Sequence, residues 1–201
     1  MNRPTDRSPP VAGTTLIVPG YRGSDGGHWQ TWMESRIPGA RRVSGIDWDT
    51  PAVAVWAAVI RREITAESAP VWLVAHSFGC LAAVLAGTDR SERVAGALLV
   101  APADPECFSP VGLRQGTGPA ASSPVSLTPF MPKHALDFPT LVVASRNDPW
   151  MPWPRVRRWA RRWDSKLIEI GEAGHINPDS GFGPWPEGLG LLRNLQELRD
   201  H

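Results

Sequence analysis

Ser77 is the residue whose surroundings most clearly indicate chemistry. In the stretch "LVAHSFGC" (residues 73–80), an apolar strand pattern breaks at this serine into the first turn of a predicted helix. Ala75 lies two positions before the serine, where the usual pattern has glycine, and Gly79 lies two positions after it. This small-x-Ser-x-Gly pattern is typical of a nucleophile elbow, a tight strand-to-helix turn that lifts the serine hydroxyl above a sheet. The alternative for Ser77 is an ordinary N-cap residue of the helix.

A nucleophilic serine needs a base and an acid, and both residue types follow later strand patterns. A serine hydroxyl is a weak nucleophile until a base takes its proton. The stretch "RNDPW" places Asp148 after one strand pattern, and "GEAGHINPDSG" places His175 after the next. The chain order Ser77, Asp148, His175 is that of α/β-hydrolases and differs from the orders in two other serine-protease folds. We predict these three residues as a catalytic triad, with Asp104 of "APADP" as the competing acid.

The other four histidines are weaker candidates for the base. His76 precedes the serine directly and cannot reach its hydroxyl from behind the turn, so we predict that it is packed or hydrogen-bonded. His28 follows a glycine-rich loop and is expected to cap a helix or brace the site. His134 lies in a proline-rich stretch and is expected to be exposed, and His201 is terminal.

The backbone N–H groups of Phe78 and Tyr21 are the predicted donors to an oxyanion. Phe78 follows the serine at the start of the helix, where N–H groups point out of the helix end. Tyr21 lies in the loop "PGYRGSDGGHW" (residues 19–29), whose glycines let the backbone approach a ligand closely. A phosphate is the alternative ligand, but the loop lacks the lysine of a P-loop and the G-x-G-x-x-G spacing.

Aromatic residues follow several of the predicted site residues. Trp29 follows the oxyanion loop, Trp150 follows the acid, and Phe182 and Trp185 follow the histidine. Such side chains could wall a pocket for an acyl or aromatic group, or they could pack the loops that hold the triad. All four are candidate substrate-pocket residues.

Apolar runs alternate with helical patterns along the chain, and this alternation predicts the fold class. Continuously apolar strands are typical of a parallel sheet with both faces covered by helices. We therefore predict an α/β fold, a three-layer αβα sandwich with a mostly parallel central sheet and its ligand site beyond the carboxyl ends of the strands. Strands are expected at residues 14–20, 41–45, 70–75, 94–101, 139–145 and 165–170, and helices at 28–36, 51–67, 78–88, 153–164 and 187–199.

Residues 102–139 depart from this alternation. The segment carries eight prolines, which leave little room for a regular helix. We expect a loop-rich excursion on the surface that is too short and broken to form a full helical cap. An open site that favours small acyl groups would follow.

Length and charge limit the broad class of protein. A chain of 201 residues without a Ser/Gly linker is expected to form a single domain over residues 1–201, with residues 1–12 as a flexible tail. The net charge of +1 gives no global field for nucleic acid or an anionic membrane, and no apolar run is long enough to span a bilayer. We expect a cytoplasmic protein with no cofactor, no metal, and no nucleic-acid or membrane partner.

The stretch "RVRRWARRWDSK" (residues 155–166) is expected to face the core on one side and solvent on the other, with a nucleic-acid patch as the alternative.

Five stretches between residues 18 and 188 together form a specific signature: "VPGYRGSDGGHWQTW", "LVAHSFG", "APADP", "VVASRNDPWM" and "GEAGHINPDSGFGPWPEG". Through them the chain resembles the small serine hydrolases of the α/β-hydrolase superfamily, in the family that includes retinoblastoma-binding protein 9. The resemblance implies a compact α/β-hydrolase core without a large cap domain, with a catalytic serine at Ser77, an acid at Asp148 and a histidine at His175. The family's association with a retinoblastoma-type pocket protein is not carried over, because no L-x-C-x-E pattern occurs in this chain.

The sequence therefore predicts a serine hydrolase, carboxylesterase-like, that cleaves an ester, thioester or amide of a small acyl substrate through an acyl-enzyme. The competing hypothesis is a non-enzymatic interaction protein that uses the hydrolase scaffold to bind a protein partner. A loop such as residues 109–135 that blocks the site would favour this second hypothesis.

Overall fold

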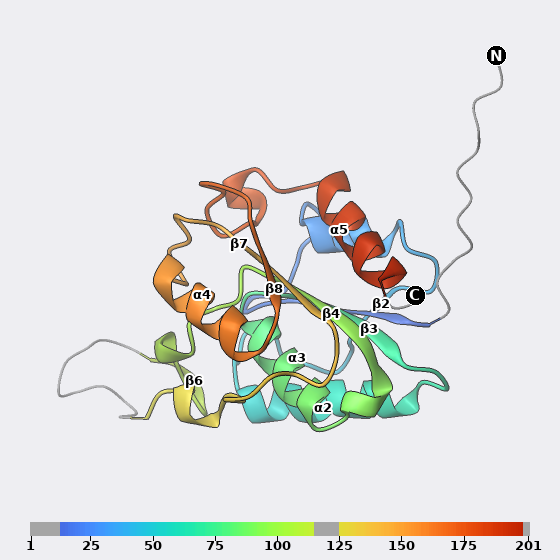
Figure 1. Cartoon of the computed structure of the whole chain (residues 1–201), viewed down its shortest axis with the longest axis horizontal. Helices are drawn as coiled ribbons and strands as arrows, with labels where there is room; N and C mark the ends of the chain where they lie inside the picture. The colour runs from blue at the N-terminus through green and yellow to red at the C-terminus, as the bar shows by residue number, and fades with distance from the viewer. Residues whose placement is uncertain (1–12, 115–124, 199–201) are drawn as a thin grey trace, which may run out of the picture.

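Six parallel strands form the centre of the molecule, and helices cover both faces of the sheet (Figure 1). The structure, a computed structural model, describes residues 13–114 and 125–198, so the predicted tail over residues 1–12 lies outside the described residues. Hydrogen-bonded neighbours follow the order β2-β1-β3-β4-β7-β8, and every pair in this sheet is parallel. The strands are β1 (Thr15–Val18), β2 (Arg41–Arg42), β3 (Val71–His76), β4 (Val94–Val100), β7 (Thr140–Ala144) and β8 (Lys166–Glu169). The α-helices are α1 (Trp29–Glu34), α2 (Val53–Ala66), α3 (Phe78–Thr88), α4 (Trp153–Arg162) and α5 (Pro186–Glu197).

The expected elements form, with ends that differ from the predicted ones by a few residues. Every residue of β3 and of β4 is buried, because these central strands are covered on both faces. This double burial is why they are continuously apolar rather than alternating. The first strand ends at Val18 because Pro19, which follows it, has no N–H to donate to a neighbouring strand.

Two apolar clusters separate the sheet from its helices and make the three-layer sandwich. Buried residues of α2, α3 and α4 belong to one cluster, together with side chains from one face of the sheet. Buried residues of α1 and α5 belong to the other cluster, on the opposite face. The predicted fold class is confirmed. Within the described residues no large cap domain covers the carboxyl ends of the strands.

The 102–139 segment differs from its prediction in one respect. As expected it contains no α-helix among its described residues; two short 3-10 turns, η2 (Pro105–Cys107) and η3 (Thr128–Phe130), and a hairpin of β5 (Phe108–Ser109) and β6 (Gly112–Leu113) form instead. The expected surface excursion is met only in part, because the segment also contributes buried side chains to the larger cluster: Phe108, Leu127, Met131, Leu136 and Phe138. Prolines prevent a helix, but they do not prevent the apolar residues between them from packing into the core.

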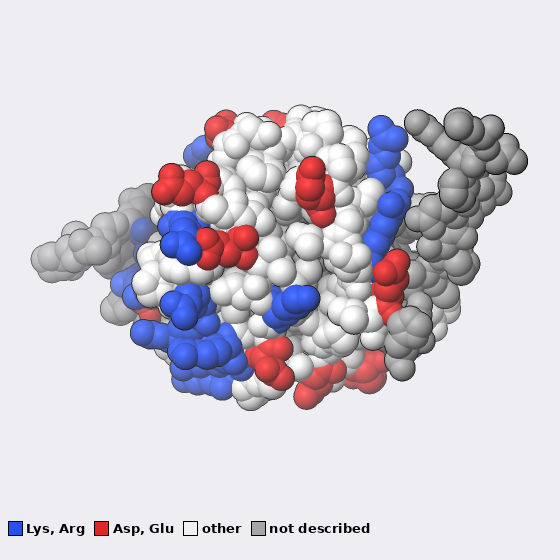
Figure 2. All heavy atoms as spheres, turned by 45° about the horizontal axis from the view of Figure 1, so that its top comes forward, with Lys and Arg blue, Asp and Glu red and all other residues white. Residues whose placement is uncertain are grey.

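Helix α4 has the two-sided character that its sequence predicts. Val156, Trp159 and Ala160 are its buried residues. Arginines occupy the remaining face, and Figure 2 shows basic side chains gathered on this flank of the molecule. Over the described ranges, no helix has the length and apolar character needed to cross a membrane.

Candidate active site

Ser77 lies at the sharp break between β3 and α3, in a strained backbone conformation. Its φ and ψ are 53° and −126°, a combination that residues with a Cβ rarely adopt. Backbone hydrogen bonds fix the turn: the Ser77 N–H donates to the Val100 carbonyl at 3.0 Å, and the Ser77 carbonyl accepts from the N–H groups of Cys80 and Ala103. The conformation and its supports are those of a nucleophile elbow.

Two glycines let the loop after β1 pack directly against this elbow. A Cβ on Gly79 would lie 2.7 Å from the Val18 carbonyl oxygen, and it would also clash with the carbonyl of Pro19. A Cβ on Gly20 would lie 2.7 Å from the Cβ of Ser77. Glycine is therefore required at both positions by close backbone approach.

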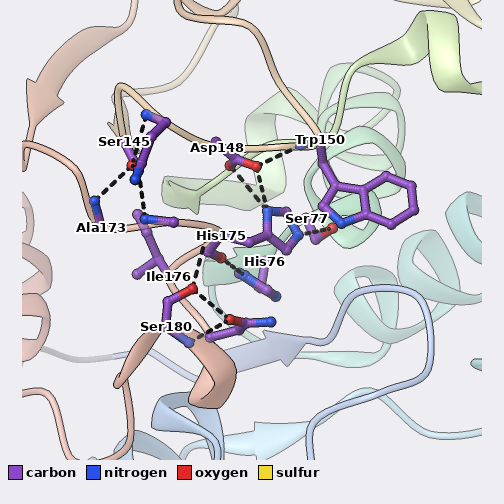
Figure 3. A network of polar contacts seen from close by, with 12 residues as sticks. His76, Ser77, Ser145, Asp148, Trp150, Ala173, His175, Ile176 and Ser180 are labelled. Carbon is purple, nitrogen blue, oxygen red and sulfur yellow. Dashed lines mark hydrogen bonds and ion pairs between the residues drawn. The ribbon is translucent and has the colours of Figure 1, made fainter.

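The side chains of Ser77, His175 and Asp148 lie in a row (Figure 3). His175 Nε2 is 2.8 Å from Ser77 Oγ, and His175 Nδ1 is 2.9 and 3.0 Å from the two carboxylate oxygens of Asp148. Because the carboxylate accepts, Nδ1 carries the ring proton and Nε2 is left to accept from the serine hydroxyl. Each of the three residues is 8% exposed, so the row is shielded from bulk water while a small part of each residue stays accessible.

The loop that carries Asp148 is hydrogen-bonded to the loop that carries His175. Asp148 Oδ1 accepts from the Trp150 N–H at 2.8 Å, which fixes the carboxylate. Ser145 Oγ accepts from the Ala173 N–H at 2.9 Å and donates to Asn147 Oδ1 at 2.7 Å. Asn147 Oδ1 also accepts from the N–H of Gly174, directly before the histidine, at 2.8 Å. Sequence reasoning missed Ser145 and Asn147, although both lie within three residues of the predicted acid.

Asp104, the competing acid, has other partners. Its Oδ1 accepts from the Glu106 N–H at 3.0 Å and from Arg155 Nη1 at 3.0 Å. The structure thus places Asp148, and not Asp104, at the imidazole of His175.

The remaining histidines lie where the sequence predicts them. His76 is buried, and its Nε2 is 3.0 Å from the His175 carbonyl oxygen. His28 is the N-cap of α1, where its Nδ1 accepts from the Gln30 N–H at 3.1 Å. Burial lowers the pKa of His28 to about 4 and the pKa of His76 well below its ordinary value, so both rings are neutral near pH 7. His134 is exposed, and His201 lies outside the described residues.

The predicted oxyanion donors, the N–H groups of Phe78 and Tyr21, belong to the two segments that meet at the elbow. Phe78 is the first residue of α3, and Tyr21 is the first residue after Gly20 in the loop that packs on the elbow. Among the hydrogen bonds of the described residues, none uses the N–H of Phe78 or of Tyr21. Both groups therefore stay candidate oxyanion donors.

Gln30 supports the loop after β1, a role that sequence reasoning missed. Its side chain is fully buried, and its Nε2 donates to the carbonyls of Val18 and Val74, both at 3.1 Å. Its Oε1 accepts from Ser24 Oγ at 2.7 Å. Gln30 therefore joins the ends of β1 and β3 to the loop that connects β1 to α1. A fully buried glutamine with every polar atom paired gives no local sequence signal, because its partners are remote backbone carbonyls.

The candidate pocket residues separate into two groups. Trp150 lies beside the triad: its ring centroid is 6.2 Å from that of His175, and it stacks on Phe108 at 6.2 Å. Trp29 is 0% exposed, so the prediction that it walls a substrate pocket is wrong. Phe182 and Trp185 line a separate hollow of about 500 Å³ between β8 and α5, whose lining includes no triad residue. Phe108, from the 102–139 segment, instead joins Phe78 and Trp150 in an aromatic cluster near Ser77.

Comparison with known proteins agrees with this fold and places the chain among serine hydrolases. The serine hydrolase family model matches residues 15–194. A crystal structure of a YdeN-like hydrolase from Pectobacterium atrosepticum is 39% identical, with a TM-score of 0.80 over 92% of this chain and 91% of that one. The Bacillus subtilis protein YdeN, described as a hydrolase, is 24% identical over 189 residues, 85% of this chain and 89% of YdeN. The YdeN crystal structure gives a TM-score of 0.68 over 92% of this chain and 98% of YdeN. Grouping with retinoblastoma-binding protein 9 stays a prediction, and the chain belongs to the serine hydrolase family.

Proposed function

We propose that this hydrolase cleaves carboxylic esters through an acyl-enzyme on Ser77, with His175 as general base and acid and Asp148 as its orienting carboxylate. The observation that carries the proposal is the pair of hydrogen bonds on one imidazole, 2.8 Å to Ser77 Oγ and 2.9 Å to Asp148 Oδ1. A base in contact with the nucleophile and itself held by a third group is the arrangement that activates a serine hydroxyl. These groups supply the nucleophile and the proton transfers without a metal or cofactor.

In acylation, Ser77 Oγ forms a bond to the substrate carbonyl carbon while its proton moves to His175 Nε2. The carbonyl oxygen becomes an oxyanion, and in this proposal the N–H groups of Phe78 and Tyr21 donate to it. The carboxylate of Asp148 stabilises the imidazolium without taking its proton. Collapse of the tetrahedral intermediate breaks the carbon–oxygen bond to the leaving group, which departs as an alcohol with the proton from His175.

In deacylation, water takes the place of the leaving alcohol. His175 Nε2 accepts a proton from the water as its oxygen attacks the acyl carbon, and the same two N–H groups stabilise the second oxyanion. The intermediate then expels Ser77 Oγ, which regains its proton from His175. The free enzyme and a carboxylic acid result.

The tight packing of the aromatic cluster of Phe78, Phe108 and Trp150 favours substrates with a small acyl group. Phe78 and Phe108 are fully buried and 4.6 Å apart by ring centroids, so they leave no deep channel between them. Esters are proposed ahead of amides because the carbonyl of an ester is less stabilised by resonance than that of an amide and is attacked more readily. Thioesters of the same small acyl groups are the second substrate class to assay.

The test is steady-state hydrolysis of p-nitrophenyl esters with acyl chains of increasing length, alongside matched thioesters and anilides. We expect hydrolysis to be fastest for the short esters and to fall by about 10⁵-fold or more in Ser77→Ala, with unchanged circular dichroism. Retained hydrolysis in Ser77→Ala would contradict the proposal. A folded wild-type protein that cleaves none of these substrates would favour the alternative, a scaffold that binds a protein partner.

A further inference from the structure

The turn that follows His175 is strained. Ile176 has a φ of 49°, in the left-handed region that β-branched residues avoid. Its own N–H donates to the Ala173 carbonyl at 3.1 Å, and the His175 N–H donates to Ser180 Oγ at 3.1 Å. A β-branched residue persists in this conformation only where its surroundings hold it there.

Two buried side chains hold this turn through consecutive carbonyl groups. His76 Nε2 is 3.0 Å from the His175 carbonyl oxygen, and Trp29 Nε1 donates to the Ile176 carbonyl at 2.8 Å. His76 ends β3 and Trp29 begins α1, so the two donors come from different elements. Figure 3 shows the contact between His76 and the main chain of His175, on the side away from Asp148.

The donor role of His76 follows from its partner and its surroundings. A carbonyl oxygen only accepts, so the Nε2 of His76 must carry a proton. The ring is held in place by edge contacts with His28 at 4.9 Å and Trp29 at 5.8 Å between centroids. Trp29 is fully buried and packs against Trp185 at 5.4 Å, so neither donor can turn away from the loop without moving packed neighbours.

We infer that His76 and Trp29 are positioning residues, which hold the strained turn at Ile176 so that the imidazole of His175 faces Ser77. The inference rests on the proposed function, since it assigns these side chains to the service of the general base. Loss of either N–H lets the turn relax, and the imidazole then moves relative to the serine. A displacement of about 1 Å at a reacting group is enough to cost up to about 100-fold in rate.

Trp72 provides a matched control for Trp29. Both tryptophans are buried in the same apolar cluster, at 1% and 0% exposure. Trp72 Nε1 has no hydrogen-bond partner among the described residues, whereas Trp29 Nε1 is bonded to the Ile176 carbonyl. Replacement by phenylalanine therefore removes similar packing in both cases, but it removes a hydrogen bond to the turn only in Trp29→Phe.

The first experiment measures the rate constant for modification of Ser77 by a fluorophosphonate in Trp29→Phe and Trp72→Phe. It is paired with the downfield proton NMR signal of the His175 Nδ1–H and with thermal melting. We expect the rate constant to fall by about tenfold or more in Trp29→Phe and to change by less than about twofold in Trp72→Phe. The Nδ1–H signal should shift or broaden in Trp29→Phe alone. Equal rate constants and equal spectra in the two variants would overturn the inference.

A second pair of variants addresses His76 by the same measurements. His76→Gln keeps a side-chain N–H donor, and His76→Met removes it at similar size. We expect His76→Gln to retain more of the reactivity of Ser77 than His76→Met, at equal melting temperature or after correction for any unfolded fraction. Equal losses in the two variants would mean that His76 acts by packing alone and would overturn its assignment.

These outcomes also separate the inference from the proposed function. If wild-type Ser77 does not react with the fluorophosphonate, the proposed function fails. The His175 proton signal then decides the positioning role by itself, through its difference between Trp29→Phe and Trp72→Phe.

Discussion

The nucleophile elbow and the turn after the histidine are both strained, yet they are held by different means. Ser77 has a φ of 53° and Ile176 a φ of 49°. The elbow is held by main-chain hydrogen bonds: the Ser77 N–H donates to the carbonyl of Val100, and the Ser77 carbonyl accepts from the N–H of Cys80. At Ile176, consecutive carbonyls are held by two buried side chains.

This difference determines what each turn needs from the sequence. The elbow needs small residues where backbones approach closely, as at Gly79. The turn at Ile176 needs specific side chains, His76 and Trp29, contributed by elements about 100 to 150 residues away along the chain. The elbow therefore leaves a local pattern of small residues in the sequence, whereas the second turn depends on distant side chains that leave no such pattern.

The largest expected effect is that of Asp148→Asn on kcat/KM, and it tests how the imidazole is oriented without disturbing the turn at Ile176. Asp148→Asn leaves the supports of the Ile176 turn in place, but the new amide can donate to Nδ1 and so favour the wrong tautomer of His175. We expect kcat/KM for the best p-nitrophenyl ester to fall by roughly 10³- to 10⁴-fold, with little change in melting temperature. Asp104→Asn, at the competing acid, should lower it by less than about fivefold. Similar losses in both variants would refute the assignment of the acid.

The next largest effect is the loss of stability expected when the close backbone approach at the elbow is disturbed. Gly79→Ala places a methyl group against the backbone carbonyls of Val18 and Pro19, which cannot move as a flexible side chain could. We expect the free energy of unfolding to fall by about 3 kcal/mol or more, from urea titrations followed by circular dichroism. Gly26→Ala is the control, because nothing lies within 4 Å of its added Cβ. Stability of Gly79→Ala within about 1 kcal/mol of Gly26→Ala would show that the close approach at the elbow is not needed.

The elbow and the α/β alternation were predictable because both depend on local pattern. The spacing of Ala75, Ser77 and Gly79 indicates a tight turn, and continuously apolar strands indicate a parallel sheet with both faces covered by helices. The order of strands then brings the residues after β3, β7 and β8 to one edge of the sheet, so a base and an acid could be sought there.

The supports of the site were not predictable in the same way. A tryptophan after a loop reads equally well as a pocket wall or as a packed donor, and only the fold shows that Trp29 Nε1 meets the carbonyl of Ile176. Gln30 pairs with the carbonyls of two strands that the sequence does not place in contact. The burial of Phe108 was missed because proline content predicts the absence of helix and says nothing about which side chains face the core.

The smallest expected effect is the pH dependence of stability, which distinguishes the two turns because only the turn at Ile176 is held by a titratable side chain. Two neutral histidines, His28 and His76, pack against each other, and His76 packs against His175, whereas the elbow glycines do not titrate. Burial lowers the pKa of His28 from 6.5 to about 4, so between these values the unfolded chain binds the proton that the folded protein excludes. The contribution of His28 to stability is full above about pH 6.5 and is lost as the pH falls toward 4, by roughly 3 kcal/mol in total.

The variant His28→Asn tests this pH dependence, because asparagine is a good N-cap that does not titrate. Urea titrations at a series of pH values should show a shallower loss of stability below pH 6.5 in His28→Asn than in wild type. The remaining slope includes that of His76, whose pKa is also lowered by burial. Identical slopes in the two proteins would contradict a neutral, buried His28.

The most direct measurement of the central claim is labelling with a fluorophosphonate, followed by mass spectrometry to locate the adduct, in wild type and His175→Ala. The hydrogen bond of 2.8 Å between His175 Nε2 and Ser77 Oγ predicts one adduct per chain, on Ser77, at a rate that falls by at least about 10³-fold in His175→Ala. An adduct on another residue, equal labelling of the two proteins, or no adduct on folded wild-type protein would contradict the account.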